Sequence, residues 1–264
     1  MSERTDYAPG EFCWVELVSA DVDAAASFYG DLFGWERERY EPDPEGYWYF
    51  RRDGDLVAGL EGLRGKGQVP GWLNYVRVDD VTESAGRVRD AGGTVVEGPL
   101  EVPGEAGSLA VCQDTEGTVF GLWQPGELEG AQLVNEPGAW TWANLMTRDL
   151  DGAKDFYGKV FGWEAAHNEE APPNILNWQV EGQRWPEGLG GLMGITDELP
   201  ADMPPHWETY FIVENADDSV EQAKATGGKL GFGPIDVPTG RLGILVEPRG
   251  LPFGIIESHY PDPR

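Results

Sequence analysis

Cysteine is scarce in this sequence, which argues against two common kinds of site. The only two cysteines, Cys13 and Cys112, each lie in an apolar run and outside any CxxC pair. Isolated cysteines in such runs are typical of small buried hydrophobic residues. We therefore expect neither a disulfide framework nor a thiolate metal site. No histidine lies near either cysteine in the sequence, as a catalytic thiol would require.

Basic residues are also few. The 264 residues include 19 Lys and Arg but 47 Asp and Glu, for a formal net charge of −28. A field of this sign repels phosphate backbones and anionic membrane surfaces, so we expect no nucleic-acid partner and no membrane partner. The acidic surface favours solubility and gives a weak preference for neutral or cationic ligands.

Long apolar segments are absent as well. No apolar run approaches the ~18 to 20 residues that span a bilayer. The first ten residues lack the basic start and apolar core of a signal peptide. These absences predict a cytoplasmic protein.

The sequence does contain an internal repeat. At an offset of 128 residues, three segments recur: WVEL at 14–17 as WANL at 142–145, FYG at 28–30 as 156–158, and FGW at 33–35 as 161–163. A segment rich in Gly, Glu and Pro separates the copies and is typical of a linker. We predict a first domain at 1–126, a linker at 127–138 and a second domain at 139–264.

Each half repeats one order of elements twice. The alternating run Phe12–Val18 predicts a strand, and Asp21 follows at a helix N-cap position. Apolar residues then recur at helical spacing over 24–33, and Gly34 lies where the helix would stop. Strands are expected next, at 47–52 and 56–60, and the order restarts at Trp72. The pattern predicts an α+β fold of four βαβββ units.

These units, with the patterns "D…A..FY..lFGW" and "D..G..fGlwq", resemble the vicinal oxygen chelate (VOC) superfamily. That group holds glyoxalase I, extradiol dioxygenases, and bleomycin- and fosfomycin-resistance proteins. The chain most resembles two-domain, glyoxalase/bleomycin-resistance-like actinobacterial proteins of the 27–30 kDa antigen type. The resemblance implies two tandem VOC domains, each with a sheet curled around a cleft.

The resemblance also locates the positions of metal ligands. Metal-dependent members carry one ligand on the first strand and one on the last strand of each unit. The first-strand positions fall here on Trp14, Leu73, Trp142 and Glu208, and the last-strand positions on Gly121, Gly254, Leu60 or Glu61, and Leu192 or Met193. Because Trp and Gly cannot ligate a metal, we expect no cofactor; a divalent metal at an unusual site is the alternative.

The three histidines do not restore the predicted metal site. His167, His206 and His259 all fall at predicted loop positions. We expect them at the surface, and a noncanonical metal site is the alternative interpretation.

The same register predicts which side chains face the clefts. Residues i and i+2 of a strand share a face, so Glu16 should accompany Trp14, and Asn144 should accompany Trp142. The candidate ligand-binding residues are Trp14, Glu16, Trp48, Phe50, Tyr75, Trp142, Asn144, Trp178, Glu208 and Tyr210. The alternative for the aromatic residues is that they fill the core between sheet and helices.

Glu16 is the one candidate catalytic residue. A carboxylate beside indole in a closed cleft would have a raised pKa and could act as an acid or base. The alternative is that Glu16 reaches solvent or pairs with an arginine.

Three functions are compatible with the sequence. The first is a metal-free protein that binds a small aromatic or hydrophobic molecule, for antibiotic resistance or sequestration. The second is a lyase, isomerase or hydroxylase-like enzyme of specialised metabolism or aldehyde detoxification, using Glu16 or an unrecognised metal. The third is an interaction module with vestigial clefts. We expect a monomer or homodimer.

Overall fold

The computed structural model describes residues 4–64, 68–167, 172–180 and 189–259. The first half contains β1 (Phe12–Ser19), α1 (Val22–Phe33), β2 (Glu36–Arg39), β3 (Tyr47–Arg52), β4 (Asp55–Gly62), β5 (Gly71–Arg77), α2 (Val81–Asp90), β6 (Thr94–Val102), β7 (Gly107–Gln113) and β8 (Val119–Pro125). The second half contains β9 (Trp140–Thr147), α3 (Leu150–Phe161), β10 (Glu164–His167), β11 (Ile175–Gln179), β12 (Gly190–Gly194), β13 (His206–Ile212), α4 (Ala216–Ala225), β14 (Lys229–Val237), β15 (Gly240–Val246) and β16 (Pro252–Ser258).

This order confirms the four predicted βαβββ units. Each half forms one eight-stranded sheet, in the orders β2-β3-β4-β1-β5-β8-β7-β6 and β10-β11-β12-β9-β13-β16-β15-β14. The two units of a half meet where their first strands pair antiparallel, β1 with β5 and β9 with β13. The first strands of paired units therefore lie at the middle of each sheet.

The helices begin and end where the repeat predicts. The Asp21 side chain accepts a hydrogen bond from the Ala24 amide at 3.1 Å, which caps α1. Gly34 ends α1 in the left-handed region, at φ 72°, which a residue without Cβ adopts freely. Asp149 and Gly162 have the same roles for α3. The apolar face of α1 is buried, as its spacing predicts.

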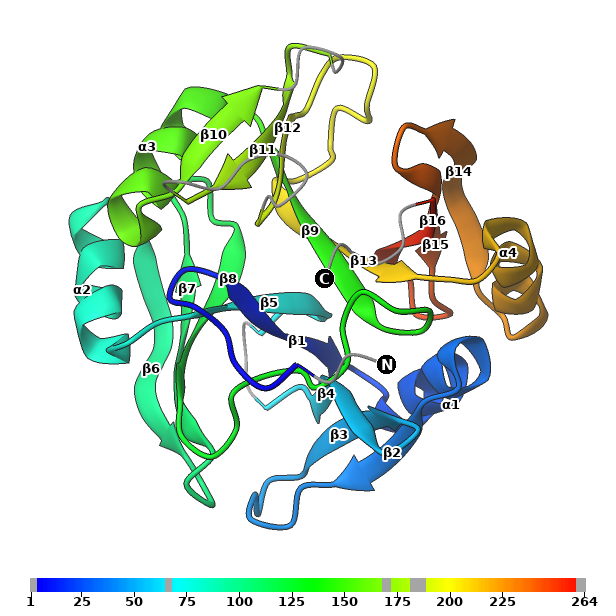
Figure 1. The fold of residues 1–264 in the computed structure, drawn as a ribbon, viewed down its shortest axis with the longest axis horizontal. Helices are drawn as coiled ribbons and strands as arrows, with labels where there is room; N and C mark the ends of the chain where they lie inside the picture. The colour runs from blue at the N-terminus through cyan, green and yellow to red at the C-terminus, as the bar shows by residue number, and fades with distance from the viewer. Residues whose placement is uncertain (1–3, 65–67, 168–171, 181–188, 260–264) are drawn as a thin grey trace.

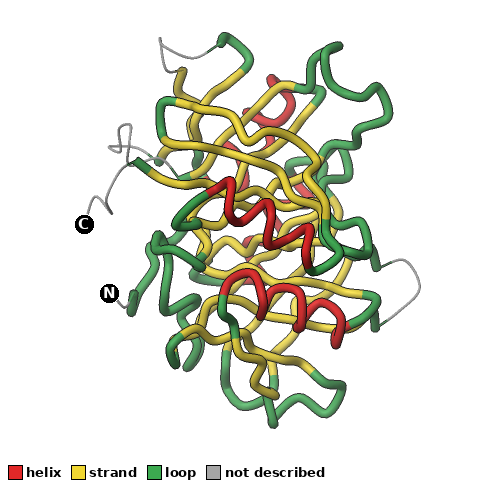
Figure 2. Tube along the Cα trace, turned by 90° about the vertical axis from the view of Figure 1, so that its right-hand side faces the viewer, coloured by secondary structure: helices red, strands yellow, loops and turns green. Residues whose placement is uncertain are grey.

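The four helices lie between the two sheets. Helix α1 packs against α4, and α2 packs against α3, so each contact joins the two halves (Figure 1). Figure 2 shows two of these helices side by side, with strands above and below them. The helix-covered faces of the sheets thus point inward, and the opposite faces are left to form clefts. Among the described residues, no helix combines the length and apolar character needed to cross a bilayer.

The repeated FGW corners connect the halves in a reciprocal way. The indole Nε1 of Trp35 donates to the carbonyl oxygen of Gly138 at 2.7 Å, and Trp163 Nε1 donates to that of Gly10 at 2.9 Å. Gly10 and Gly138 occupy matching positions of the repeat, just before β1 and β9. Each corner therefore binds the segment that leads into the first strand of the other half.

The predicted linker packs along the first sheet as an ordered segment. The amide of Ala131 donates to the carbonyl of Cys13 at 2.8 Å, and that of Gln132 donates to Leu56 at 2.7 Å. The side chains of Ala131, Leu133 and Val134 are buried. The connection between the halves is thus part of the core.

Candidate functional site

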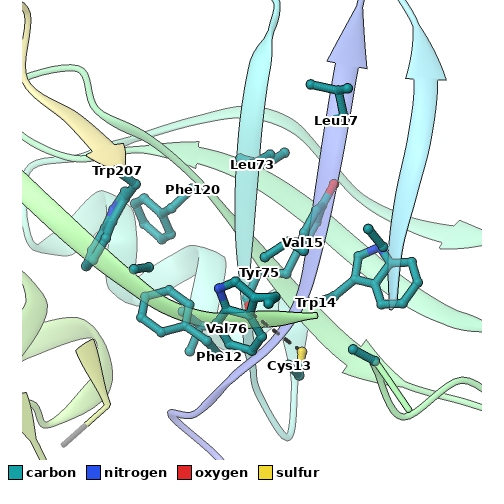
Figure 3. Close-up of a cluster of buried hydrophobic side chains, with 14 of the residues drawn as sticks. Phe12, Cys13, Trp14, Val15, Leu17, Leu73, Tyr75, Val76, Phe120 and Trp207 are labelled. Atoms are coloured by element: carbon teal, nitrogen blue, oxygen red, sulfur yellow. Dashed lines mark hydrogen bonds between the residues drawn. The ribbon is translucent and has the colours of Figure 1, made fainter. Parts of the chain in front are cut away.

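The cleft faces of the two sheets line two clefts with a combined volume of ≈ 1700 Å³. Asn74 and Thr209, on the opposite faces of β5 and β13, hydrogen bond to each other, so the two clefts open on opposite sides of the molecule. We call these clefts the first and second halves of the cavity. Trp14, Glu16 and Val18 of β1 line it, whereas Val15 is buried on the opposite face. Figure 3 shows Trp14 on one side of β1 and Phe12, which contacts Trp207 at a ring distance of 5.1 Å, on the other, because the register shifts between these two residues. The predicted alternation of β1 is therefore present from Trp14 onward but not at Phe12.

Glu16 is buried in the first half of the cavity, with 5% of its surface exposed. Tyr75 Oη donates to Glu16 Oε1 at 3.3 Å, and the Tyr47 hydroxyl also hydrogen bonds to this carboxyl group. Trp14 Nε1 in turn donates to Tyr47 Oη at 3.0 Å. Glu16 thus pairs with tyrosine hydroxyls inside the cleft and does not reach solvent.

Burial and a second carboxylate control the charge of Glu16. Burial, followed by the nearby charge of Glu61, raises the pKa of Glu16 to about 8, although the hydrogen bonds from Tyr47 and Tyr75 oppose this rise. Glu16 is therefore largely protonated at neutral pH and can donate a hydrogen bond or a proton.

Glu61, which the sequence offered only as an alternative to Leu60 at a last-strand ligand position, is a functional candidate because of its contacts. It lies on β4, and burial raises the pKa of its carboxyl group. Arg64 Nε contacts Glu61 Oε2 at 2.8 Å, and Gln68 Nε2 donates to Glu61 Oε1 at 2.8 Å. Arg64 also pairs with Asp43 at 2.6 Å. Arg64 and Gln68 lie between β4 and β5, whereas Asp43 lies between β2 and β3, so the folded chain brings the two connections together.

Tyrosine side chains fill the last-strand ligand positions of the first half. In the parallel pairing of β1 with β4, Gly59 lies beside Glu16, and in that of β5 with β8, Gly121 lies beside Tyr75. A Cβ on Gly59 would lie 1.8 Å from the Oη of Tyr47, and one on Gly121 would lie 2.1 Å from the Tyr75 ring. The structure corrects the alignment near Leu60 or Glu61, because Gly59 holds the matching position.

The second half repeats this replacement. Gly191 pairs with Asn144 and Gly254 with Tyr210. A Cβ would lie 1.7 Å from Asn144 Oδ1 in the first case and 2.1 Å from the Tyr210 ring in the second. The position predicted near Leu192 or Met193 is therefore Gly191.

These positions do not fit a metal ion held in the family's usual way. The four last-strand positions are glycines, and three of the four first-strand positions are Trp or Leu. Within the described part of the chain, no group of three or more His, Cys, Asp or Glu side chains is arranged to hold a metal. The chemistry of the cavity must be argued from its remaining carboxylates and hydroxyls.

Glu208 is the buried carboxylate of the second half. It pairs across the sheet with Asn144, and 8% of its surface is exposed. Trp142 Nε1 donates to Asn144 Oδ1 at 2.8 Å, and Tyr210 also hydrogen bonds to Asn144. In the first half the buried carboxylate, Glu16, lies on the first strand of the first unit, whereas in the second half Glu208 lies on the first strand of the second unit.

His206 is not the surface loop residue that its sequence position suggested. It is the first residue of β13, pairs with Met146, and so shares a face with Glu208 two residues later. His206 Nε2 lies 3.2 Å from Glu208 Oε2. Burial lowers the pKa of His206, but the hydrogen bond and the charge of Glu208 outweigh it and raise the pKa. His167 and His259 are exposed, as expected.

The structure places three predicted cleft residues elsewhere. Phe50 and Trp178 are fully buried against Tyr29 and Tyr157, on the helix side of their sheets. Trp48 alternates with the cleft-lining Tyr47 and Tyr49, and the Arg37 guanidinium lies 4.4 Å from its ring. The predictions for β3 and β11 chose the wrong phase, since the aromatic run of β3 shows no alternation and β11 contains a single aromatic residue.

The other predicted residues divide between the two halves of the cavity. Six of them line it directly: Trp14, Glu16, Tyr75, Asn144, Glu208 and Tyr210. Trp142 is not among the lining residues but holds Asn144 through its indole nitrogen. Their roles in ligand binding stay predictions.

Paired βαβββ units that curl around a cleft define a protein of the VOC class, here with two tandem domains. The family model described as "Glyoxalase/Bleomycin resistance protein/Dioxygenase superfamily" matches residues 12–122 and 140–255. The chain belongs to this superfamily.

Relatives of the same length support this assignment. The chain is 34% identical to the anthracycline biosynthesis protein DnrV of Streptomyces peucetius, over 96% of this chain and 95% of DnrV. It is also 34% identical to a protein of Mycobacterium tuberculosis (strain CDC 1551 / Oshkosh) named "Putative glyoxylase CFP32", over 97% and 98% of the two chains.

Solved structures share the fold at low sequence identity. The 2,3-dioxygenase LapB from Pseudomonas sp. KL28 matches with a TM-score of 0.65 and 13% identity, over 97% of this chain and 96% of LapB. The Mn(II)-bound glyoxalase from Novosphingobium aromaticivorans matches with a TM-score of 0.63 and 16% identity, over 94% and 82%. These likenesses concern the fold alone.

Proposed function

We propose that the chain binds a flat, polycyclic aromatic or hydrophobic small molecule in its cavity and thereby sequesters it. The observation that carries this proposal is the aromatic wall in place of metal ligands, made by Trp14, Tyr47, Tyr49, Tyr75 and Trp123 in the first half of the cavity and by Tyr210 and Phe232 in the second half. Rings of this kind offer large apolar faces with polar edges, which suits fused-ring ligands.

Exposed apolar side chains extend the same wall. Leu100 on β6 and Ile235 on β14 are repeat counterparts that are 37% and 41% exposed, and Phe232 is 53% exposed. All three line the cavity. Clustered exposed apolar groups at a concave surface indicate a binding site, because a ligand removes them from water.

Glu16 gives this wall a specific polar contact. Its protonated carboxyl group can donate to a carbonyl or hydroxyl oxygen of the ligand, while Tyr47 and Tyr75 hold its orientation. The relationship to DnrV supports the ligand class, because anthracyclines are fused-ring compounds that carry carbonyl and hydroxyl groups.

Tryptophan fluorescence tests the proposal with a matched pair of variants. Trp14→Phe removes an indole from the cavity wall, and Trp48→Phe removes one that lies outside it. We expect hydroxyanthraquinones to quench the wild type and Trp48→Phe equally, and to bind Trp14→Phe several-fold more weakly. Absence of quenching across a panel of fused-ring compounds would contradict the proposed function.

A second candidate is an enzyme that uses Glu16 as an acid or base. The pKa of about 8 and the two tyrosine contacts favour it, because a general acid near neutrality transfers protons efficiently. Such a group suits a lyase or isomerase step at carbon beside a carbonyl.

Glu16→Gln distinguishes binding from catalysis. Glutamine resembles the protonated carboxyl in shape and still donates a hydrogen bond, but it cannot transfer a proton. Recovery of unchanged ligand after long incubation with wild type supports sequestration. Conversion that Glu16→Gln abolishes while affinity persists supports the enzyme, as judged by mass spectrometry of the ligand.

A further inference from the structure

The second half of the cavity contains a buried carboxylate oxygen without a partner. Glu208 Oε2 lies 3.2 Å from His206 Nε2, whereas Glu208 Oε1 is buried and has no hydrogen-bond partner among the described residues. Glu208 lines the cavity. A buried polar atom left unpaired is unfavourable, so a ligand group that donates a hydrogen bond there would be stabilised.

The charges around this oxygen favour a cation. The second half of the cavity is lined by the carboxylates of Asp202 and Glu208. The described residues that line this cleft include no Lys or Arg. Acidic groups in a concave site concentrate cations there, and the net charge of −28 adds to this potential.

The first half lacks an equivalent free oxygen. There the position opposite Glu16 is Leu73, and Glu16 is already held by Tyr75 and Tyr47. In the second half the matching tyrosine, Tyr210, bonds instead to Asn144, which leaves Glu208 available. The two clefts therefore offer different polar contacts.

We propose that Glu208, oriented by His206, binds a protonated amine carried by the aromatic ligand. This inference rests on the proposed function and adds to it the class of ligand, a fused-ring compound with one basic amine. The ammonium group donates to Glu208 Oε1 as a charge-assisted hydrogen bond, while the ring system lies against Tyr210 and Phe232 in the same cleft.

Two probes that differ only in the amine test this assignment. They are 1-(3-aminopropylamino)anthraquinone and its N-acetyl derivative, titrated at neutral pH into the full chain. We expect wild type to bind the free amine at least tenfold more tightly than the acetylated probe. Glu208→Gln should lose this preference and bind the acetylated probe as wild type does, which also shows that the variant is folded.

Asp202→Asn is the matched control. Asp202 lines the same cleft from an exposed position before β13, so its loss removes one charge without removing the buried oxygen. We expect the tenfold preference to persist in Asp202→Asn. An equal loss in both variants would overturn the inference and assign the preference to the general field of the cavity.

The remaining outcomes separate this inference from the proposed function. Equal wild-type affinity for the two probes overturns the amine site and leaves the aromatic binding intact. Failure of both probes to bind overturns the proposed function and the inference with it. A preference that EDTA abolishes and Zn²⁺ restores would assign Glu208 to a metal, which also overturns the inference.

Discussion

Asn74 and Thr209 are counterparts in the repeat, and they hydrogen bond to each other at the contact between β5 and β13. Asn74 Nδ2 donates to Thr209 Oγ1 at 2.9 Å, and Thr209 Oγ1 donates back to Asn74 Oδ1 at 3.2 Å. Both side chains are buried. Two first strands, one from each half, thus meet through a reciprocal polar pair inside an otherwise apolar interface.

Thr209→Val should destabilise the whole chain. Valine has nearly the same shape but lacks the hydroxyl, so the buried Asn74 amide loses both bonds, at a cost of about 1–3 kcal/mol. Adding Asn74→Leu should recover part of this loss, because the unpaired polar group is then removed. Urea unfolding of both single variants and the double variant measures the coupling, and additive changes would contradict the pairing.

Glu16 should make stability fall as pH rises. The folded-state pKa of about 8 lies above the ordinary 4.5, so the unfolded chain loses this proton first. Stability is therefore lost between pH 4.5 and 8, by up to about 5 kcal/mol, and the full penalty is present above pH 8.

Glu16→Gln removes this contribution, so the difference between the variant and wild type reports on Glu16. Its free energy of unfolding should approach and then exceed that of wild type as pH rises from 5 to 9. Titrating groups that do not interact with Glu16 are common to both proteins and cancel in the difference, whereas the interaction of Glu16 with Glu61 is part of what the difference measures. A difference that stays constant across this range would show that Glu16 is ionised at ordinary pH in the folded protein.

The fold was predictable because its signals repeat. Four strand and helix patterns in one register determine the βαβββ order, and the same register locates Gly121 and Gly254 on the last strands. Strands β2 and β10 were missed, because ERER and EAAH are short edge strands with little alternation of apolar residues. Strand β6 was predicted too short, because its Gly98-Pro99 step is typical of a turn.

The site was only partly predictable. Alternation correctly placed Glu16 beside Trp14, but it could not choose a face for the unbroken aromatic run of β3. The contacts of Glu61 with Arg64 and Gln68 depend on how a loop closes, and that of His206 with Glu208 depends on where β13 begins. Sequence periodicity indicates which residues share a face of a strand or helix, but it carries no information on how a loop closes or where a strand begins.

Gly121→Ala should show that Tyr75 occupies the former ligand position. A Cβ at 121 would lie 2.1 Å from the buried Tyr75 ring, which must move and weaken its bond to Glu16. We expect a loss of about 1–3 kcal/mol in urea unfolding.

Two comparisons control for the change of residue type in Gly121→Ala. In a Tyr75→Ala background the added methyl group has room, so Gly121→Ala should cost much less there. Gly86 lies in α2, where an added Cβ meets nothing within 4 Å, and Gly86→Ala should stabilise by about 0.5–1 kcal/mol. Equal losses at position 121 in both backgrounds would contradict the proposed packing.

Trp35→Phe and Trp163→Phe should each weaken both halves together. Each change removes an indole N–H that bonds to the other half, at Gly138 and Gly10, and leaves a buried carbonyl without that donor. We expect losses of about 1–3 kcal/mol for each, against less than about 1 kcal/mol for the control Trp48→Phe.

The form of the transition decides whether these reciprocal bonds join the halves into one folding unit. If they do, circular dichroism and fluorescence should follow one coincident transition that shifts as a whole in both variants. Halves that fold independently would instead show two transitions, and Trp35→Phe would shift only one of them. The single transition is expected because the aromatic core, with Phe33 against Phe211 at 5.1 Å, also crosses between the halves.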